Sequence, residues 1–291
     1  QLVYADEIAT KDYTHYNFFR KLELTKKQWQ TVVKTAKNLK LKIYFDIFGV
    51  KSLNLSEEIG VDGIKIHPTD INNINLIKSV NKSKIKNVIL GIGGASLIDI
   101  KKAVKILNKN LTVMIGFQSY PTPNKEINLN KLIFLRKILN KKISLGYADH
   151  SIKDSASAIL PAICLGATFI EKHLTLKSKI ALEDSESAIY KNEFKELIKS
   201  SKFASEAIGN SKNKLGYFLS KNETKYKKNI QRSLVLNKSL LKNTKIKKNN
   251  IFDLKRTSIK NTFSSFNQIK NKVTKYNLKK NTPIEKKHIH E

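Results

Sequence analysis

Two stretches near the middle of the chain, GYADHS (residues 146–151) and GATFIEKHLT (residues 166–175), decide how the fold is interpreted. Each is a short apolar segment that ends at a histidine, His150 in the first and His173 in the second. Because side chains alternate along a β-strand, Glu171 and His173 are expected to share one face. The chain has 6 histidines, and two of them are placed where consecutive strands end. This pattern indicates a site built at the ends of neighbouring strands.

The same alternation of strand and helix runs through most of the chain. Apolar, β-rich segments predict six strands, at residues 42–46, 61–67, 87–91, 111–117, 143–147 and 167–172. Apolar residues at helical spacing predict amphipathic helices, at residues 26–39, 97–107, 129–139, 154–165 and 192–207. Strands that alternate regularly with helices predict a parallel sheet.

Two architectures fit such a sheet: an open doubly wound sheet and an eight-stranded barrel. The segment GIGGAS (residues 91–96) follows a middle strand and matches the G-x-G-x-x-G dinucleotide fingerprint only in part. Gln1 is not an initiator methionine, so the sequence is interpreted as a fragment. We therefore expect an α/β fold with a parallel (β/α)8 TIM-type barrel, of which the first strand or two is missing from this chain.

The pattern changes after the last predicted helix. We expect a barrel domain over residues 1–212, a polar, lysine-rich linker over residues 213–228 and a small domain over residues 229–291. Strand-like pieces at residues 232–236 and 251–254, and the pair Pro283 and Ile284, lie between Lys/Asn-rich turns. The small domain is therefore expected to be loop-rich and built of short β-strands.

Charge and composition limit the classes of function. The formal net charge is +31, which would suit a nucleic-acid-binding protein, but only four of the 55 basic residues are arginines. Arginine is the preferred residue for reading bases, and here lysine is spread evenly with Ile and Asn, as in A/T-rich coding. A lysine-rich nucleic-acid binder is therefore the less favoured alternative. Cys164 is the single cysteine, and neither a signal peptide nor a run of about 20 apolar residues is visible, so we expect a cytoplasmic protein without a membrane partner.

Three side chains in or just after the predicted strands could carry chemistry. His150 and His173, placed at one edge of a sheet, could bind a divalent ion together, or each could be a polar strand end that hydrogen-bonds to a loop. Lys65 lies in an apolar strand with His67 on the same face. A buried lysine is costly unless it meets an anion, although its ammonium group could also reach the rim of the sheet.

These motifs resemble the paired signature of the sialic acid synthase (N-acetylneuraminate synthase) family, in which GYADHS is followed by GATFIEKHLTL. SYPTP (residues 119–123), Lys65 with DINN (residues 70–73), and Asp184 extend the resemblance. QRSLV (residues 231–235) is similar to the motif that opens the family's small C-terminal antifreeze-like (SAF) domain, a β-clip fold. The resemblance covers essentially the whole chain.

The resemblance implies an activity and a set of site residues. Members condense phosphoenolpyruvate with the open-chain aldehyde of an N-acyl hexosamine, such as N-acetylmannosamine, and release phosphate. The product is a sialic-acid-type nonulosonic acid, and legionaminic and pseudaminic acid synthases share the motifs. A divalent metal, Mn²⁺ or Mg²⁺, would be bound by His150 and His173. The resemblance and the strand pattern give the remaining roles: substrate binding for Lys65, Gln118 and His67, and catalysis for Asp184, Tyr120 and Arg232. Arg232 would come from the partner subunit of a domain-swapped homodimer.

Four positions depart from the family pattern, because Pro68, Gly91, Asp46 and Ala148 stand where the family has hydroxyl side chains. Each lost hydrogen bond to a charged group is worth about 1.5–3 kcal/mol, so binding of the phosphoenolpyruvate anion should be weaker. Either Lys65 and His67 compensate, or the chain is a catalytically impaired, sugar-binding homologue of the same fold.

Overall fold

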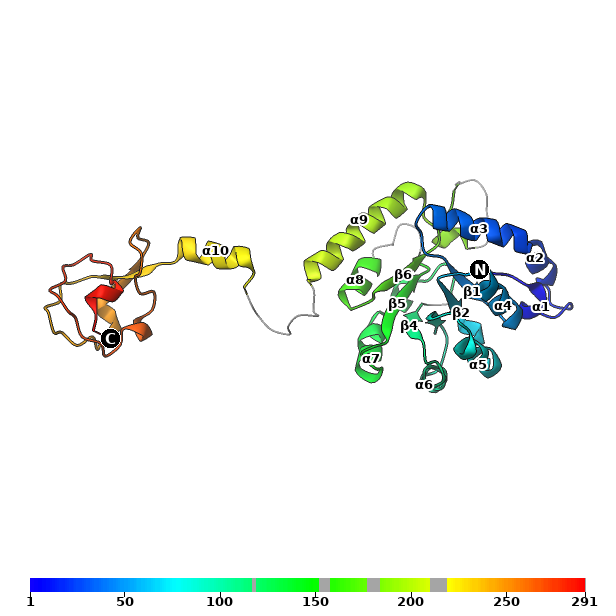
Figure 1. Cartoon of the computed structure of the whole chain (residues 1–291), viewed down its shortest axis with the longest axis horizontal. Helices are drawn as coiled ribbons and strands as arrows, with labels where there is room; N and C mark the ends of the chain where they lie inside the picture. Colours follow the sequence, from blue (N-terminus) through cyan, green and yellow to red (C-terminus); the bar gives the residue numbers. More distant parts are fainter. Residues whose placement is uncertain (117–118, 152–157, 177–183, 210–218, 291) are drawn as a thin grey trace. The chain divides into compact units, whose positions relative to one another are not determined.

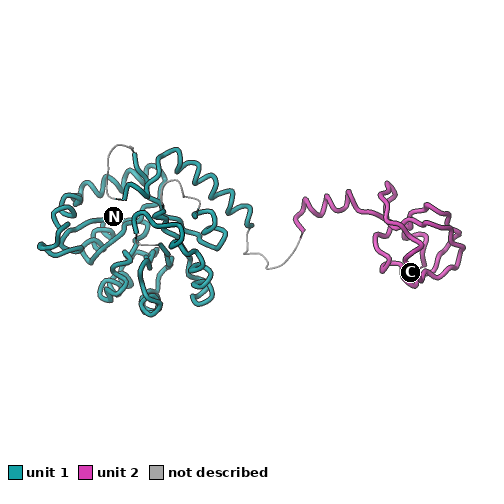
Figure 2. Tube along the Cα trace, turned by 180° about the vertical axis from the view of Figure 1, so that it is seen from behind, with its two compact units in different colours: residues 1–210 teal, residues 211–291 magenta. Residues whose placement is uncertain are grey.

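The computed structural model describes residues 1–116, 119–151, 158–176, 184–209 and 219–290. The chain divides into two compact units, residues 1–210 and residues 211–291 (Figure 2). The first unit holds every predicted barrel strand, and the second holds the predicted small domain.

The first unit is built on a six-stranded, entirely parallel sheet whose strands follow one another in chain order (Figure 1). The strands are β1 (Tyr44–Ile47), β2 (Gly63–Ile66), β3 (Asn87–Gly91), β4 (Asn110–Ile115), β5 (Ser144–Asp149) and β6 (Phe169–Lys172). All six coincide with predicted strands. In Figure 1 the sheet curls and the helices lie around its outside, as in part of a TIM-type barrel.

Helices connect these strands, three further helices precede the first strand, and one follows the last. Their bounds are α1 (Ala5–Ile8), α2 (Tyr16–Lys21), α3 (Lys26–Asn38), α4 (Val50–Ile59), α5 (Ile74–Lys82), α6 (Leu97–Ile106), α7 (Asn130–Ile138), α8 (Ile159–Cys164) and α9 (Lys191–Ile208). Several begin at polar caps: the Asn73 side chain accepts a hydrogen bond from the backbone of Leu76, and the Ser96 hydroxyl accepts one from that of Asp99. Such caps satisfy backbone donors that the first turn leaves unpaired.

The two faces of the sheet have different neighbours, which distinguishes the two architectures considered above. The outer face, with Ile64 and Ile66 of β2 fully buried, packs on the helices in one large apolar core. The inner face forms a separate cluster of Ile89, Met114 and Ala148. A doubly wound sheet would carry helices on both faces, so the consecutive strand order and the enclosed inner cluster identify the barrel type.

The start of the chain packs beside β1. The backbone N–H of Leu2 donates to the carbonyl of Asp46 at 2.9 Å, and the Leu2 side chain is fully buried. Farther on, the Glu7 carboxylate accepts backbone hydrogen bonds from Lys51 and Ser52 at the start of α4. A helix N-terminus favours negative charge, so Glu7 holds α1 against the carboxyl end of β1.

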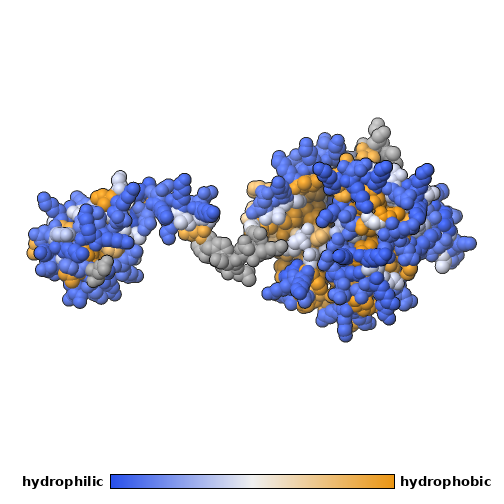
Figure 3. All heavy atoms as spheres, viewed as in Figure 1, coloured by the Kyte–Doolittle hydropathy of each residue, from blue (hydrophilic) through white to orange (hydrophobic). Residues whose placement is uncertain are grey.

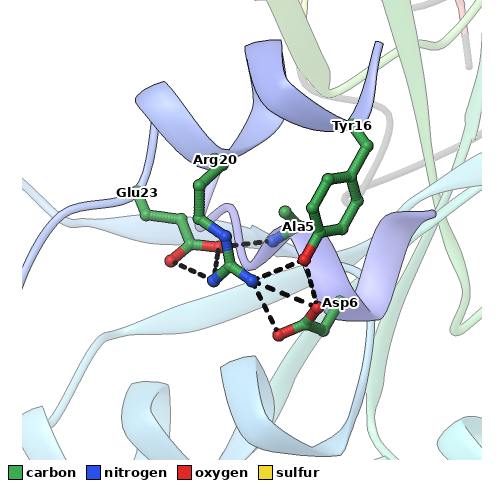
Figure 4. Close-up of polar contacts among 5 residues, drawn as sticks. All are labelled: Ala5, Asp6, Tyr16, Arg20 and Glu23. Atoms are coloured by element: carbon green, nitrogen blue, oxygen red, sulfur yellow. Dashed lines mark hydrogen bonds and ion pairs between the residues drawn. The ribbon is translucent and has the colours of Figure 1, made fainter. Parts of the chain in front are cut away.

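A polar network around Arg20 joins α1 to α2 (Figure 4). The Arg20 guanidinium donates to Asp6 at 3.1 Å, to Glu23 at 3.0 Å and to the Tyr16 hydroxyl at 2.5 Å. The Tyr16 hydroxyl in turn donates to Asp6, and the Ala5 backbone donates to Glu23. Hydrogen bonds to Tyr16, Glu23 and Asp6 raise the pKa of Arg20. Binding two carboxylates at once requires a planar fork of donors, which explains an arginine in so lysine-rich a chain.

The second unit has its own apolar core. It contains α10 (Lys221–Ile230) and an antiparallel pair of β7 (Ser233–Leu236) and β8 (Phe252–Lys255), which match two predicted strand pieces. Val235 forms a bridge with Pro283, the third predicted piece. Buried Leu236, Ile246 and Ile284 form its centre. The segment expected to be a linker, residues 213–228, is in part helical, because α10 begins at Lys221.

The surface reflects the high lysine content. Figure 3 shows hydrophilic residues over most of the visible face of both units. Among the residues that the structure describes, no helix combines the length and the apolar character that crossing a bilayer would require.

Candidate active site at the carboxyl ends of the strands

Three of the predicted site residues, all histidines, lie at one end of the sheet. His67 follows β2, His150 follows β5 and His173 follows β6. Because the strands are parallel, their carboxyl ends meet at the same edge, which is where barrels of this type place their functional residues.

The two histidines face each other across the strand ends. Their ring centres are 5.2 Å apart and the ring planes are 80° apart. The Tyr120 ring lies 4.7 Å from that of His150 and 6.1 Å from that of His173. The backbone carbonyl of His150 accepts hydrogen bonds from Thr122 N–H at 2.8 Å and from the Ser187 hydroxyl at 2.7 Å. Three segments distant in sequence therefore fix this corner of the site.

The spacing of the histidines fits a shared metal ion. Two imidazoles that share a metal ion through metal–nitrogen bonds of about 2 Å would have ring centres roughly 4.5–5.3 Å apart for angles of about 90–110° at the metal. Burial lowers the pKa of His173, against the charges of Asp184 and Glu171, and so favours the neutral imidazole that binds metals. Within the described residues no group of three or more His, Cys, Asp or Glu side chains converges as a metal cage. Two imidazoles would leave positions for water and substrate oxygens.

An ion pair lies directly behind the histidines, on the outer face of the sheet. Lys172 donates to the Asp149 carboxylate at 2.7 Å, and the two side chains are 1% and 0% exposed. The Tyr147 hydroxyl also donates to Asp149, at 2.8 Å. Asp149 and Lys172 are paired in register between β5 and β6, and each immediately precedes one of the histidines. The pair therefore ties together the two strand ends that carry them.

A second charged cluster crosses the inside of the curled sheet. Lys65 of β2 donates to both carboxylate oxygens of Glu171 on β6, at 2.7 and 3.0 Å, and lies 3.5 Å from the Asp46 carboxylate on β1. Burial disfavours the charged form of Lys65, but the negative charges of Asp46 and Glu171 more than offset this and raise its pKa. Burial raises the pKa of Asp46 to about 6, although Lys65 acts in the opposite sense. Lys65 is thus a largely buried cation whose anionic partners belong to the chain, and its binding of a substrate anion stays a prediction.

His67 does not supply a positive charge at neutral pH. Burial, followed by the nearby Lys65 charge, lowers the pKa of His67 to about 4. Its ring lies 5.1 Å from that of Phe48, and its Nδ1 is 2.7 Å from the Thr69 hydroxyl. Of the two residues expected to compensate for the lost hydroxyls, Lys65 alone is charged at neutral pH.

The remaining predicted residues fall in different places. Asp184 lies 3.9 Å from Nδ1 of His173 and so belongs to the same corner. Burial raises the pKa of Tyr120, so its phenol is protonated at neutral pH. Gln118 lies outside the described residues. Arg232 is an exposed residue of the second unit, directly before β7.

Two of the departures from the family pattern are packed against each other. A side chain added at Gly91 would place its Cβ 2.7 Å from the Pro68 ring and 3.2 Å from the Ile66 carbonyl. The proline ring therefore fills the space where a serine at residue 91 would lie. Ala148, a third departure, is buried inside the barrel with its Cβ 3.0 Å from where a side chain at Gly116 would begin.

Sequence reasoning missed the roles of Glu171, Asp149 and Lys172. Strand alternation had placed Glu171 on the face of His173, which was a usable signal. Its partner Lys65 lies 106 positions away in the chain, however, and only the curl of the sheet brings the two together.

The curled parallel sheet, with its polar residues at the carboxyl ends of the strands, defines a protein of the parallel α/β-barrel class. The chain belongs to the NeuB family, whose sequence pattern matches residues 2–213. The family resemblance found in the motifs is thereby confirmed.

Individual relatives agree with this assignment. The chain is 29% identical over 245 residues to an N,N'-diacetyllegionaminic acid synthase of Campylobacter jejuni, covering 82% of this chain and 71% of the relative. An uncharacterized protein of Methanocaldococcus jannaschii is 28% identical over 213 residues, which are 72% of this chain and 62% of that protein. The solved structure of an N-acetylneuraminic acid (sialic acid) synthetase from Leptospira borgpetersenii, in complex with citrate, is 26% identical. It superposes with a TM-score of 0.70 over 79% of this chain and 80% of that one.

Proposed function

We propose that this chain is a synthase that condenses phosphoenolpyruvate with an N-acyl hexosamine, such as N-acetylmannosamine, to a sialic-acid-type nonulosonic acid. A bond forms between C3 of phosphoenolpyruvate and the aldehyde carbon of the sugar, one water is consumed and phosphate is released. The observation that carries the proposal is the pair of facing imidazoles, together with the largely buried Lys65–Glu171 pair, in a NeuB-family barrel. Small metabolites of this kind fit a cytoplasmic protein.

Each side chain has a role that follows from its position. His150 and His173 would hold a divalent Mn²⁺ or Mg²⁺ ion, which when bound supplies Lewis-acid activation of the sugar aldehyde. Lys65 would bind the phosphate or carboxylate of the donor, with His67 and Gln118 as further substrate contacts. Tyr120, protonated beside both histidines, can donate a hydrogen bond to a substrate oxygen. Asp184, next to His173, would orient a sugar hydroxyl.

Arg232 and the state of assembly complete the proposal. The family resemblance supports a domain-swapped homodimer in which Arg232 of one subunit serves the barrel of the other. A closed two-fold dimer would give each barrel one such arginine. An always-charged, forked donor suits a substrate with carboxylate and phosphate groups.

The direct test is release of phosphate. The full chain, with Mn²⁺, should release phosphate from phosphoenolpyruvate only when an N-acyl hexosamine is present, and mass spectrometry should detect the condensed acid. Lys65→Met should weaken binding of phosphoenolpyruvate about tenfold or more, a loss of about 1.4 kcal/mol or greater. The exposed Lys78 of α5 offers a matched control, because Lys78→Met removes the same charge away from the site. Absence of sugar-dependent phosphate release with any N-acyl hexosamine would exclude the synthase.

A second candidate is a sugar-binding homologue of the same fold without catalysis. It is favoured by one observation: both carboxylates beside Lys65 come from the chain itself, at the place where a donor anion would bind. If this candidate is right, calorimetry should detect binding of an N-acyl hexosamine, and no phosphate should be released when phosphoenolpyruvate is added.

A further inference from the structure

Asp46 is an unusual group for the interior of an anion-binding site. It is paired in register with Lys65, its side chain is 10% exposed, and it points one oxygen, Oδ2, at the Lys65 ammonium 3.5 Å away. Its other oxygen, Oδ1, is buried and has no hydrogen-bond partner among the residues that the structure describes. A buried carboxylate with an unsatisfied oxygen is costly, and such a group calls for an explanation.

The charges around Lys65 do not balance when every group is ionised. Glu171 already occupies the ammonium with two hydrogen bonds, so Asp46 adds a second negative charge to a single positive one. A phosphorylated donor would bring further negative charge into the same interior. Like charges a few ångströms apart disfavour one another strongly where water is excluded. The anion can bind well only if one carboxyl group is neutral.

We propose that Asp46 is a neutral carboxylic acid when phosphoenolpyruvate is bound. One proton is then taken up from solvent with each phosphoenolpyruvate that binds. This inference rests on the proposed function, because the donor is the anion in question. When Asp46 is protonated at Oδ1, its O–H group can donate a hydrogen bond. The family that the chain resembles has a threonine hydroxyl at this position. The substitution then replaces a permanent hydroxyl with one that exists only when the proton is present.

The surroundings of Asp46 support this role. Lys65 faces it from β2, Glu171 from β6, and Tyr120 from the segment after β4. Burial is the largest influence and raises the pKa of Asp46 to about 6, with Glu171 acting in the same sense and Lys65 against it. The proton is therefore within reach near neutral pH, and an incoming anion favours it further.

The proposal has a measurable consequence for affinity. If the acid form is required, the ratio of the donor's dissociation constant in the wild type to that in Asp46→Thr, in which the donor's own phosphate ionisation cancels, is nearly constant below pH 6. Above that pH it rises about tenfold per unit, because an ever smaller fraction of Asp46 carries the proton. Asp46→Thr and Asp46→Asn each place a neutral hydrogen-bond donor there at every pH. Both variants should lose the proton linkage and, at pH 7.5, bind the donor about tenfold or more tightly.

The test is calorimetric titration of phosphoenolpyruvate into the full chain at pH 7.5, in two buffers with different ionisation enthalpies. The slope of heat against buffer enthalpy counts the protons taken up. The wild type should take up close to one proton more than Asp46→Thr or Asp46→Asn. Asp12→Asn removes an exposed carboxylate 34 residues before Asp46 in the sequence (46 − 12), and this variant should behave as the wild type does.

The outcomes separate the two proposals. Phosphoenolpyruvate that binds the wild type with no proton uptake beyond that of Asp46→Thr overturns the role of Asp46 and leaves the synthase standing. If phosphoenolpyruvate binds neither the wild type nor Asp46→Thr, at pH 5.5 and at pH 7.5 alike, both proposals are overturned. Thermal unfolding of the two Asp46 variants checks that they are folded. Thr and Asn differ in shape, so a change in proton uptake shared by both variants cannot come from altered packing at residue 46.

Discussion

The ammonium nitrogen of Lys172 lies 2.7 Å from a carboxylate oxygen of Asp149, and neither side chain is reached by more than a trace of solvent. The residue after each is a histidine, and because strand side chains alternate, the ion pair points outward while the histidines point to the inner side. The pair fixes the register of β5 and β6 directly beneath the predicted metal ligands. Removing one partner of this ion pair should therefore lower the free energy of unfolding.

Lys172→Met should lower the free energy of unfolding by about 3–5 kcal/mol, because it leaves the Asp149 carboxylate buried with a hydroxyl partner in place of its cation. The double variant Asp149→Leu/Lys172→Met should recover much of this loss, since no charge stays buried. Urea denaturation measures both. Lys199→Met, which removes an exposed lysine 3.8 Å from Glu196 on α9, should change stability by no more than about 0.5 kcal/mol. Equal losses in Lys172→Met and Lys199→Met would contradict the buried pair.

Pro68 and Gly91 should behave as a coupled pair. Gly91→Ser alone should destabilise the first unit by about 1–3 kcal/mol, because its Cβ would lie 2.7 Å from the Pro68 ring. Pro68→Ser/Gly91→Ser removes the ring and makes room. A double-mutant cycle by chemical denaturation should give a favourable coupling of about 0.5–3 kcal/mol, whereas strictly additive effects would show that the two positions are independent.

The stability of the first unit should depend on His67 below neutral pH. The unfolded imidazole takes up its proton near pH 6.5, whereas burial lowers the folded pKa to about 4. Between these values the unfolded chain binds the proton and the folded chain does not, so stability contributed by His67 is lost as the pH falls from 6.5 towards 4. Asp46, with its raised pKa, acts in the opposite direction between about pH 4 and 6.

Comparing the wild type with His67→Asn isolates the histidine. The difference in free energy of unfolding between the two proteins should shrink as the pH is lowered from 7 to 4.5. A difference that stays constant over this range would show that His67 keeps its ordinary pKa in the folded chain.

Metal binding should require both facing histidines. His150→Ala and His173→Ala should each sharply reduce the Mn²⁺ bound per chain, as measured by elemental analysis and by the electron paramagnetic resonance of free Mn²⁺. The exposed His15 provides a control of the same residue type, and His15→Ala should leave the metal content unchanged. Full stoichiometry in both site variants would falsify the two-histidine site.

Arg232 should be needed for turnover but not for the metal. Arg232→Ala should abolish phosphate release and retain Mn²⁺ binding, while Arg256→Ala, another exposed arginine of the second unit, should remain active. Mixing inactive Arg232→Ala with inactive His150→Ala should restore part of the activity, because a mixed dimer contains one barrel with intact histidines and a partner with intact Arg232. Subunit exchange is verified with tagged chains. Exchange without recovered activity would contradict a role for Arg232 across the dimer.

Local chemistry explains what was predictable. The six strands, several of the helices around them and the histidines at the ends of two strands could be predicted, because side-chain periodicity and end signals are properties of neighbouring residues. Helices α4 and α5 were not among the predicted helices. The signature around His150 and His173 was sufficient to indicate the family, which the match over residues 2–213 confirms. The helix α10, within a segment expected to be a linker, was missed because its lysine-rich sequence has little apolar periodicity.

The sequence by itself determined the order of the strands and the identity of the residues at the strand ends. Only the tertiary structure decided which of these residues meet. Lys65 reaches Glu171 because the sheet curls, Asp149 meets Lys172 because β5 and β6 pair in one register, and Pro68 covers Gly91 because β2 lies beside β3. Each contact joins residues distant along the chain, and its geometry depends on the twist and packing of the whole sheet. The periodicity of residues within one segment carries no information about that twist or packing.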